Sequence, residues 1–523
     1  EHITIETRDK FNNLVLATRQ LMRDNDYEID YSNGRIIFRQ PPLMVDTSTY
    51  ITSNNILGGN PVYIVADYEY APAGTRGLND GPYGGRLSGE LSDDRNNKMQ
   101  LGGTYIAEKD DSAYELKGVD FSLSESTKFI TPVRLSLSAE YAESTSRSMD
   151  GYISTNGGLG FNTVAGNNNS QGTAYKIKGG LQPAEWFSLD SYYQKVEPGF
   201  ISSSSYNYQG SLRYGYLIQY DASKELKINL RYDNQELLRN AGITSQGKIG
   251  AARTETGALQ GIYRKDQWTI TNEYRYQEAT GRVDSIQTET NQDLILDALK
   301  VDYAFSQRSN LYLIQQSTLK GDANSQTTLG TSFGYSENIA VNLQATNGTN
   351  GQAFLAGINK KVSDKTETFS NVSISNDKSS STLQTSNGAS HQLTPATRIN
   401  AQQDYATKNT QATDTTQRST GTTLGQETKL SDRWQFWASA QQGIVNDYNG
   451  TTNIETIRES GSLRFRYADK NKTAFDTKLE ARFDEGDVDK HQYLTANTLR
   501  HKITEDITVS LRENYSRTEN RTT

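Results

Sequence analysis

The stretch GSLRFRYADKNKTAFDTKLEARFD, residues 461–484, decides the fold. In an extended backbone successive side chains point to opposite faces, so alternating apolar and polar residues separate two surfaces. One face carries Leu463, Phe465, Tyr467, Phe475, Leu479, Ala481 and Phe483. The other face carries Arg464, Arg466, Asp476, Lys478, Glu480 and Arg482. With the polar turn at residues 469–472 between its arms, the stretch predicts a β-hairpin with one apolar and one charged face.

The whole chain is hydrophilic yet rich in aromatic residues. Of its 523 residues 34% are hydrophobic, and the mean hydropathy of −0.74 is low for several buried cores. Disorder is disfavoured by 31 Tyr, 15 Phe and 4 Trp, because disordered segments are poor in aromatic residues. No run approaches the roughly 20 apolar residues of a transmembrane helix. Strands of a membrane β-barrel need only about 10 alternating residues, with one face toward lipid and one toward a polar lumen.

Cysteine usage and charge restrict the chain further. It has no cysteine, which excludes disulfides and thiolate metal sites. That absence fits chance or a reducing compartment, and equally passage through an oxidising periplasm. The net charge of −8, without a basic stripe, argues against nucleic acid as a partner. Because the chain starts at Glu1 without Met or a signal peptide, we expect a processed product.

The first 75 residues are predicted to form a separate β-module. Residues 3–9 and 60–70 alternate as strands, and residues 26–42 form a hairpin pattern through Asn33-Gly34. Apolar groups on both faces of residues 60–70 suit a small sandwich core. We therefore expect a β-sandwich-like module, periplasmic or plug-like, over residues 1–75, and an outer-membrane β-barrel over residues 76–523.

The order of the segments in this N-terminal region resembles that in known outer-membrane proteins. ETRD, DYEIDYSNGRIIFRQPP and NPVYIVADYEY, followed by Tyr-rich hairpins, resemble the C-terminal part of large Gram-negative outer-membrane surface proteins of the conserved-repeat or carboxypeptidase-regulatory-like kind. The piece YEIDYSNGRIIF is also similar to segments of the giant barrel translocon of the type 9 secretion system. The resemblance covers the sequence of the N-terminal module well, whereas in the barrel only the general pattern of Tyr-rich hairpins is similar. It implies an outer-membrane location and an architecture, and it transfers no activity.

Alternating arms recur from Gly84 to the end of the chain. The residues predicted to face lipid are Leu226, Ile228, Leu230, Tyr232, Leu463, Phe465, Tyr467, Phe475 and Phe483. The residues predicted to face the lumen are Arg464, Arg466, Lys478, Glu480 and Arg482. Because these lumen positions mix both signs, we expect cross-strand pairing and no strong charge selectivity.

Short polar turns recur at roughly 27 to 43 residues, the length of two membrane strands and one longer loop. The turns are predicted at residues 222–225, 265–266, 306–309, 336–338, 363–365, 394–395, 431–433, 469–472 and 504–506. Longer polar connections are predicted at residues 144–172, 237–248, 279–291 and 409–417. Barrels of this kind place short turns in the periplasm and long loops outside, so we expect the longer connections to be extracellular.

Three tryptophans stand at the starts of predicted arms. Trp186, Trp268 and Trp434 predict a belt of aromatic residues at one membrane interface. The alternative is that each ring simply packs over a turn.

Counting arms gives about 24 strands. Such a barrel is too wide for side chains to fill, so its lumen must hold water, a plug or a partner. The chain ends RENYSRTENRTT, without the terminal Phe or Trp typical of these barrels, and we therefore expect further strands after residue 523.

No motif predicts an enzyme, a cofactor or a metal site. The histidines His2, His391, His491 and His501 are scattered, and none forms the i, i+4 pair of a helical zinc site. His491 and His501 lie at opposite ends of one arm. The acidic run at residues 483–489 lacks the spacing of a calcium loop, and we interpret it as a solvated extracellular loop that contacts divalent ions bridging lipopolysaccharide.

The sequence predicts an all-β protein, a large antiparallel transmembrane barrel of a Gram-negative outer membrane that forms a wide pore or conduit. Its expected partners are outer-membrane lipid and lipopolysaccharide. The alternatives are a membrane anchor for a larger surface protein and a protein-translocating barrel, with other domains or subunits of a surface or secretion assembly as partners. A soluble β-solenoid would need a self-similar repeat of about 20 to 50 residues, which the arms lack.

Overall fold

The computed structural model describes residues 2–8, 15–21, 27–30, 35–38, 45–46, 51–52, 60–67, 83–93, 97–107, 114–128, 132–146, 151–153, 162–164, 170–200, 210–238, 243–244, 247–248, 252–283, 288–378, 380–411, 414–469, 472–487, 489–503 and 508–520. All the regular elements of these residues are β-strands. None of the described residues belongs to a helix long and apolar enough to cross a membrane.

In the described part of the chain, 24 strands form one closed antiparallel barrel. The first twelve are β7(Tyr83–Asp93), β8(Asn97–Ala107), β9(Glu115–Lys128), β10(Pro132–Ser146), β13(Ser170–Ala184), β14(Phe187–Val196), β15(Ser211–Asp221), β16(Leu226–Leu237), β19(Ala252–Lys265), β20(Trp268–Val283), β21(Thr288–Ser306) and β22(Ser309–Lys320). The others are β23(Gln326–Ser336), β24(Ile339–Gly348), β25(Gly351–Ser363), β26(Thr366–Asp377), β27(Ser380–Thr394), β28(Thr397–Thr410), β29(Thr415–Lys429), β30(Trp434–Tyr448), β31(Asn453–Ala468), β32(Thr473–Gly486), β33(Lys490–Lys502) and β34(Thr508–Asn520).

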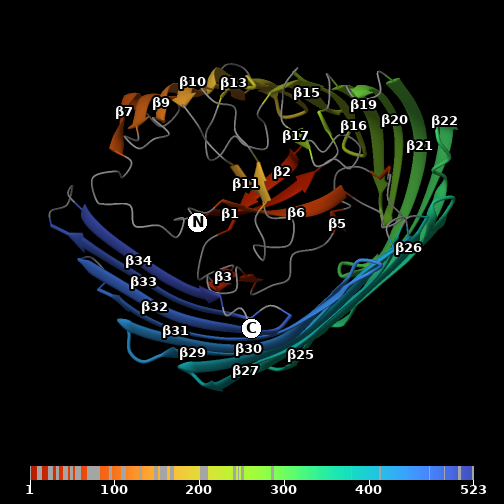
Figure 1. The fold of residues 1–523 in the computed structure, drawn as a ribbon. Coiled ribbons are helices and arrows are strands. Elements are labelled where there is room, and N and C mark those ends of the chain that lie inside the picture. Colours follow the sequence, from red (N-terminus) through yellow and green to blue (C-terminus); the bar gives the residue numbers. More distant parts are fainter. Residues whose placement is uncertain are drawn as a thin grey trace.

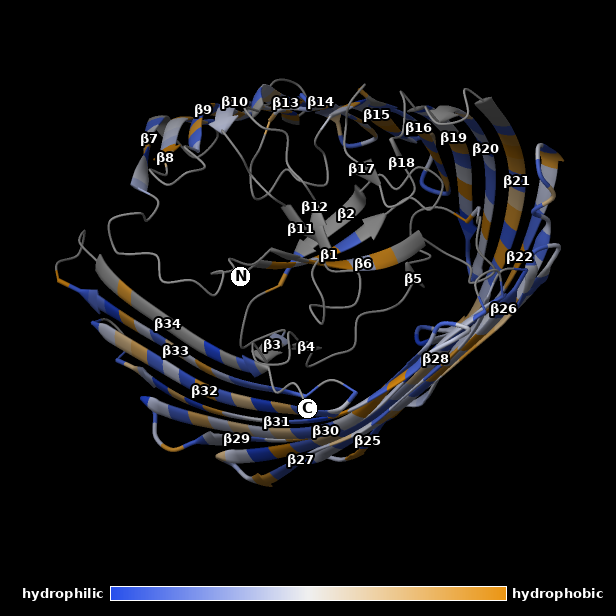
Figure 2. Ribbon diagram, viewed as in Figure 1, coloured by the Kyte–Doolittle hydropathy of each residue, from blue (hydrophilic) through white to orange (hydrophobic). Residues whose placement is uncertain are grey.

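Each barrel strand pairs with the next barrel strand along the chain, and the order closes with β34 beside β7. The hairpin of residues 461–484 has the expected register, with Leu463 opposite Leu479 and Arg464 opposite Lys478. Apolar and polar positions alternate along the strands of the ring (Figure 2). The prediction of a large antiparallel barrel of about 24 strands is confirmed.

One rim of the barrel, the turn rim, carries the short connections that the sequence predicts between residues 222 and 433. The turn predicted at residues 504–506, and residues 470–471 of the turn predicted at 469–472, lie outside the described residues. Six of these turns begin with a hydroxyl side chain that accepts a hydrogen bond, 3.1 to 3.3 Å long, from the backbone N–H two residues later. The residues are Ser223, Ser306, Ser336, Ser363, Thr394 and Ser431. A hydroxyl at this position replaces a backbone acceptor and closes the turn locally.

On the opposite rim, the loop rim, two of the four predicted long connections are shorter than expected. The expected loop at residues 279–291 is wrong, because β20 continues to Val283 and β21 begins at Thr288. The expected loop at residues 409–417 is likewise mostly strand, since β28 ends at Thr410 and β29 begins at Thr415. A backbone ladder needs no apolar side chains, so polar residues extend it past the apolar band. The predicted connections at residues 144–172 and 237–248 contain the small hairpins β11(Gly151–Ile153) with β12(Asn162–Val164) and β17(Ile243–Thr244) with β18(Gly247–Lys248).

Aromatic rings lie over glycines across the barrel wall. Tyr312 is directly opposite Gly330, and Phe369 is directly opposite Gly388. A Cβ atom added to either glycine would overlap the opposite ring. The missing side chain therefore makes room for the ring from the neighbouring strand, which fills the space that glycine leaves in a sheet.

The N-terminal segment forms a small sheet with its own core. β2(Val15–Gln20), β1(His2–Arg8), β6(Asn60–Asp67) and β5(Val45–Asp46) pair in that order, and β3(Tyr27–Asp30) pairs with β4(Arg35–Phe38). Buried Ile3, Leu21 and Tyr27 pack together. Viewed along the barrel axis, this sheet lies inside the ring of barrel strands (Figure 1). The Asn33-Gly34 turn and the boundary predicted between residues 75 and 76 lie outside the described residues.

Replacing Gly330 with alanine should destabilise the barrel. The new methyl group would displace the Tyr312 ring and break the 3.0 Å hydrogen bond from Tyr312 to Gln344. We expect a loss of about 2 kcal/mol in the free energy of unfolding, measured in urea with the protein in detergent micelles. Gly261→Ala is the matched control, because a Cβ there meets nothing within 4 Å. Equal stability of the two variants would contradict the packing role of Gly330.

Candidate functional site

The candidate site is the lumen wall where it holds the N-terminal module. Glu273 on β20 is fully buried, and its carboxylate accepts hydrogen bonds from the N–H of Ile51 at 2.8 Å and from the hydroxyl of Thr52 at 2.5 Å. The N–H of Thr52 adds a bond of 3.4 Å. From the wall, Gln260 on β19 donates to the same carboxylate at 3.0 Å. We call Ile51, Thr52, Gln260 and Glu273 the docking site.

Burying a carboxylate is unfavourable unless hydrogen bonds replace its water. Here four donors do so, three from the N-terminal segment and one from the wall. Thr52 is fully buried as well, and beside Glu273 the inner face of the wall holds Arg275, Leu296 and Ala298, all at 0 to 1% exposure. The wall is thus tightly covered where residues 51–52 contact it.

Glu273 carries no sequence signal of this role. The alternation of WTITNEYRYQ places it on the wet face of a strand, like many other charged residues. Its partners Ile51 and Thr52 are 222 and 221 positions away. Only the closed barrel brings these segments together.

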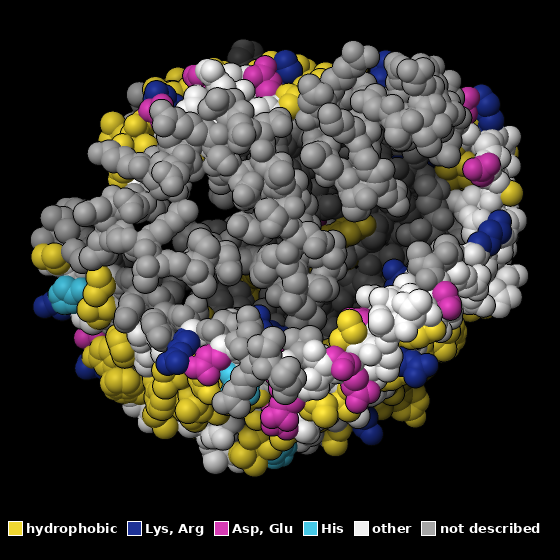
Figure 3. All heavy atoms as spheres, in the orientation of Figure 1, with side chains coloured by type: hydrophobic (Ala, Val, Ile, Leu, Met, Phe, Trp, Pro, Cys, Tyr) yellow, Lys and Arg dark blue, Asp and Glu magenta, His cyan; other side chains and the backbone are white. Residues whose placement is uncertain are grey.

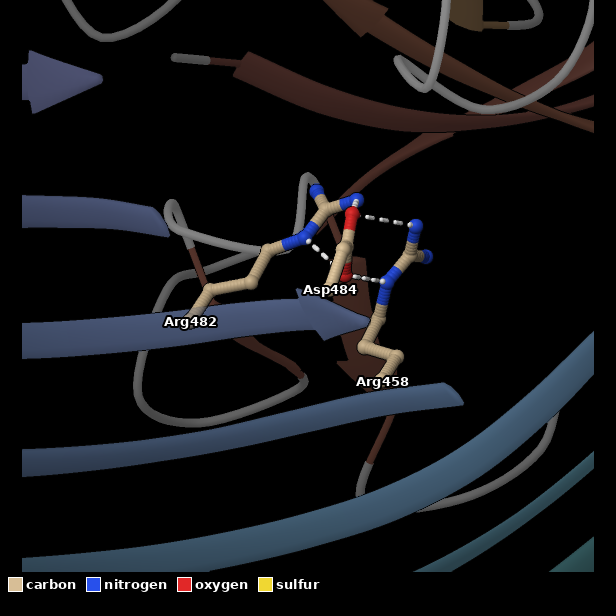
Figure 4. A network of polar contacts seen from close by, with 3 residues as sticks. All are labelled: Arg458, Arg482 and Asp484. Atoms are coloured by element: carbon tan, nitrogen blue, oxygen red, sulfur yellow. Dashed lines mark hydrogen bonds and ion pairs between the residues drawn. The ribbon is translucent and has the colours of Figure 1, made fainter. Parts of the chain in front are cut away.

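A second cluster, the arginine clamp, consists of Arg458, Arg482 and Asp484. Both guanidinium groups point at the Asp484 carboxylate, Arg458 from β31 and Arg482 from β32 (Figure 4). The Nε atoms of Arg458 and Arg482 each lie 2.8 Å from Asp484 Oδ1. The three side chains are 5%, 4% and 2% exposed. Asp484 therefore belongs to a strand and to a buried ion pair, and the interpretation of residues 483–484 as part of a solvated loop is wrong.

The residues predicted to face the lumen lie together along β31 and β32. Arg464 pairs with Asp476 at 2.8 Å, and Lys478 forms an ion pair with Glu480. Arg464 also lies over the ring of Trp437, 5.2 Å from its centre. Arg464, Lys478, Glu480 and Arg482 are buried, and Arg466 is half-buried. The charges of this wall are arranged as neighbouring opposite pairs.

The residues predicted to face lipid alternate with these charges. Leu230, Leu463 and Phe465 are exposed, and the other predicted residues, Leu226, Ile228, Tyr232, Tyr467, Phe475 and Phe483, are half-buried. Hydrophobic side chains gather along the outer edge of the barrel in the lower half of the view (Figure 3). Their contact with lipid stays a prediction.

Trp186, Trp268 and Trp434 lie in or next to short turns on the turn rim, with exposures of 56%, 49% and 42%. Each contacts a tyrosine of a neighbouring strand: Tyr220, Tyr303 and Tyr467, respectively. From Trp268 the ring contacts continue through Tyr303, Phe305 and Phe333 to Tyr335. The five residues from Trp268 to Tyr335 form a continuous aromatic row on the turn rim, and the Trp186 and Trp434 pairs are separate contacts on the same rim.

Exposed charged side chains form ion pairs in the short turns of the same rim. Lys429 lies 2.8 Å from Asp432, and Lys361 lies 2.9 Å from Asp364. These neighbouring ammonium groups hold the pKa of both carboxyls below their usual range. The pairs are exposed and contribute little to stability.

No group of three or more metal-ligating side chains occurs among the described residues. His491 and His501 lie at opposite ends of β33, as the sequence indicates. His391 lies 2.7 Å from Thr366 on β26. The described residues therefore bring no two of these histidines together.

The closed ring, its alternating faces and its aromatic rim identify the architecture. The chain has the fold of an outer-membrane β-barrel. It is similar to the copper transporter OprC, with 9% identity, a TM-score of 0.33, and 87% of this chain and 76% of that chain covered. It is also similar to the open form of the ferric-catecholate import receptor Fiu of E. coli K12, with 10% identity, a TM-score of 0.40, and coverages of 82% and 74%. A mutant porin of Rh. blastica shares 9% identity, with a TM-score of 0.27 and coverages of 50% and 86%.

No protein-family profile and no curated protein sequence matches the chain. The resemblances to conserved-repeat surface proteins and to the type 9 translocon stay predictions.

Replacing Glu273 with alanine should loosen residues 51–52. The substitution removes the acceptor of four hydrogen bonds, three of them from residues 51–52, and leaves the N–H groups of Ile51 and Thr52 without this acceptor. We expect amide hydrogen exchange at residues 51–52 to rise by at least about tenfold, measured by mass spectrometry in micelles. Glu278→Ala, at an exposed position of the same strand, is the control. Unchanged protection in the Glu273 variant would rule out the docking role.

Replacing Asp484 with alanine should destabilise the C-terminal part of the barrel. The change leaves the guanidinium groups of Arg458 and Arg482 buried without their shared carboxylate. We expect a loss of about 3 kcal/mol in the free energy of unfolding, measured by urea titration. Asp432→Ala, which breaks an exposed pair in a turn, should leave that free energy unchanged. Equal effects of the two substitutions would show that the clamp does not stabilise the wall.

Proposed function

We propose that the chain spans the outer membrane of a Gram-negative bacterium as a wide conduit, with the N-terminal module as a plug in its lumen. The observation that carries this proposal is the docking site, where a buried lumen-facing carboxylate binds the backbone of the N-terminal segment. A membrane anchor has no use for a wide interior. A conduit needs both an interior and an element that closes it.

The exterior supports insertion in a membrane. Trp268 on the turn rim and Tyr276 lie on the same strand, eight positions apart, and both are outward-facing aromatic residues. At about 3.3 Å per residue and a strand tilt of about 40°, eight positions correspond to about 20 Å of depth. That depth is comparable to the apolar band of about 25 Å between the aromatic girdles of outer-membrane barrels. Lipid and lipopolysaccharide are the partners that fit this surface.

The interior supports passage of water and solute. A barrel of 24 strands is too wide for its own side chains to fill. Its inner face is lined by polar and charged groups, including the arginine clamp and the Arg464 and Lys478 ion pairs. We propose no chemical reaction in this lumen.

Conductance across a planar bilayer tests the proposal. The intact chain should be silent or open only briefly, because the module occupies the lumen. Removing residues 1–75 should give large, stable current steps, and Glu273→Ala should give intermediate opening frequencies. Glu278→Ala should behave like the intact chain.

The negative result is equally informative. A chain without residues 1–75 that folds, as judged by its heat-modifiable migration in a gel, and yet passes no current would contradict the conduit. That result would favour the anchor for a larger surface protein.

A further inference from the structure

The inner wall of the barrel is divided by charge. Along β31 and β32 it carries the arginine clamp and further ion pairs. From β22 to β30, the inward positions of the described residues are mostly Ser, Thr, Asn, Gln and Gly. The other charged side chains on this inner face lie within three residues of a connection between strands. Farther from the connections, Asp404 is the one charged inward side chain among the described residues of β22 to β30. We call this surface the neutral wall.

Phe369 lies near the middle of the neutral wall. Its ring lies over Gly388 of β27, where an added Cβ atom would overlap it, and its side chain is half-buried. Asn359 of β25 is directly opposite Phe369, and Gln402 of β28 is directly opposite Gly388. These residues form one row across four strands, with an aromatic face between two amides.

Hydrogen bonds orient part of this row. The hydroxyl of Ser386 donates to Asp404 at 2.6 Å, and the Gln402 amide N–H donates to both carboxylate oxygens at 3.0 Å. Because the Gln402 amide nitrogen donates to Asp404, the Gln402 carbonyl oxygen is the atom that can accept a hydrogen bond from a ligand. Asn400, two residues from Gln402 on the same face, and Asn359 are exposed, and neither makes a side-chain hydrogen bond to another described residue.

Resting on the conduit proposed above, we propose that Asn359, Phe369, Asn400, Gln402 and Asp404 bind a neutral oligosaccharide during its passage. Sugar hydroxyls both donate and accept, as side-chain amides do, and Asp404 adds an acceptor. The C–H face of a pyranose ring is apolar and stacks on an aromatic face such as that of Phe369. Asp404 is the one charged group in this row, so an anionic chain would find no opposite charge there. A polypeptide would need apolar pockets for its side chains, which this row of amides does not provide.

Calorimetric titration of the full chain in micelles tests this binding without requiring any current. The detergent must carry no sugar headgroup, since such a headgroup would compete; dodecyl dimethylamine oxide satisfies this. The probes are maltohexaose, hexagalacturonate as a charged sugar of equal length, and a Gly-Ser peptide. Of the three probes, we expect only maltohexaose to give heat of binding. The affinity of Phe369→Ala for maltohexaose should be about tenfold lower than that of the unaltered chain. Phe354→Ala, which removes an exposed outward phenylalanine of β25, should bind like the unaltered chain.

Three results would overturn the proposal. They are no binding of maltohexaose, equal affinity of the unaltered chain and Phe369→Ala, and preferential binding of the peptide or the charged sugar. If the folded chain without residues 1–75 passes no current, while the full chain binds maltohexaose and Phe369→Ala loses that binding, the conduit is refuted and the sugar site stands. Current steps without maltohexaose binding would do the reverse.

Discussion

Backbone hydrogen bonding is the constraint on which the structure depends. Inside a bilayer no water is available to N–H and C=O groups, so a sheet can cross only if its ladder has no open edge. A closed antiparallel ring meets this condition for the described strands, with each strand paired to its chain neighbours. Closure also forces every strand to present one face outward and one inward, and alternation in sequence follows from it.

The inward face then determines what the lumen can hold. Charges there are buried at the docking site and at the arginine clamp, because other atoms cover them. Such groups are stable only with partners, and the partners come from adjacent strands or, at Glu273, from the N-terminal segment. Charge pairing along β31 and β32 and the amides and hydroxyls of the neutral wall give one lumen two chemically different sides.

The sequence predicted the class of fold, the approximate strand number and the short turns, because each depends on local pattern. Alternation at residues 463–467 and 475–483 indicates which side chains share a face, and Ser or Thr at the start of a turn indicates where the chain reverses. The lengths of the loops were harder to predict from the sequence. At residues 279–291 and 409–417 polar side chains looked like loops, whereas the ladder continues through most of them.

By itself, the sequence determined two faces for each strand, since the period of two residues is a property of the extended backbone. Only the tertiary structure decided which distant residues meet. Glu273 reaches Ile51, and Phe369 shares a row with Gln402, because ring closure and strand register set those neighbours. Asp484 looked like part of an acidic loop and became the centre of the arginine clamp for the same reason. Register is fixed by pairing between strands, and no single strand contains that information.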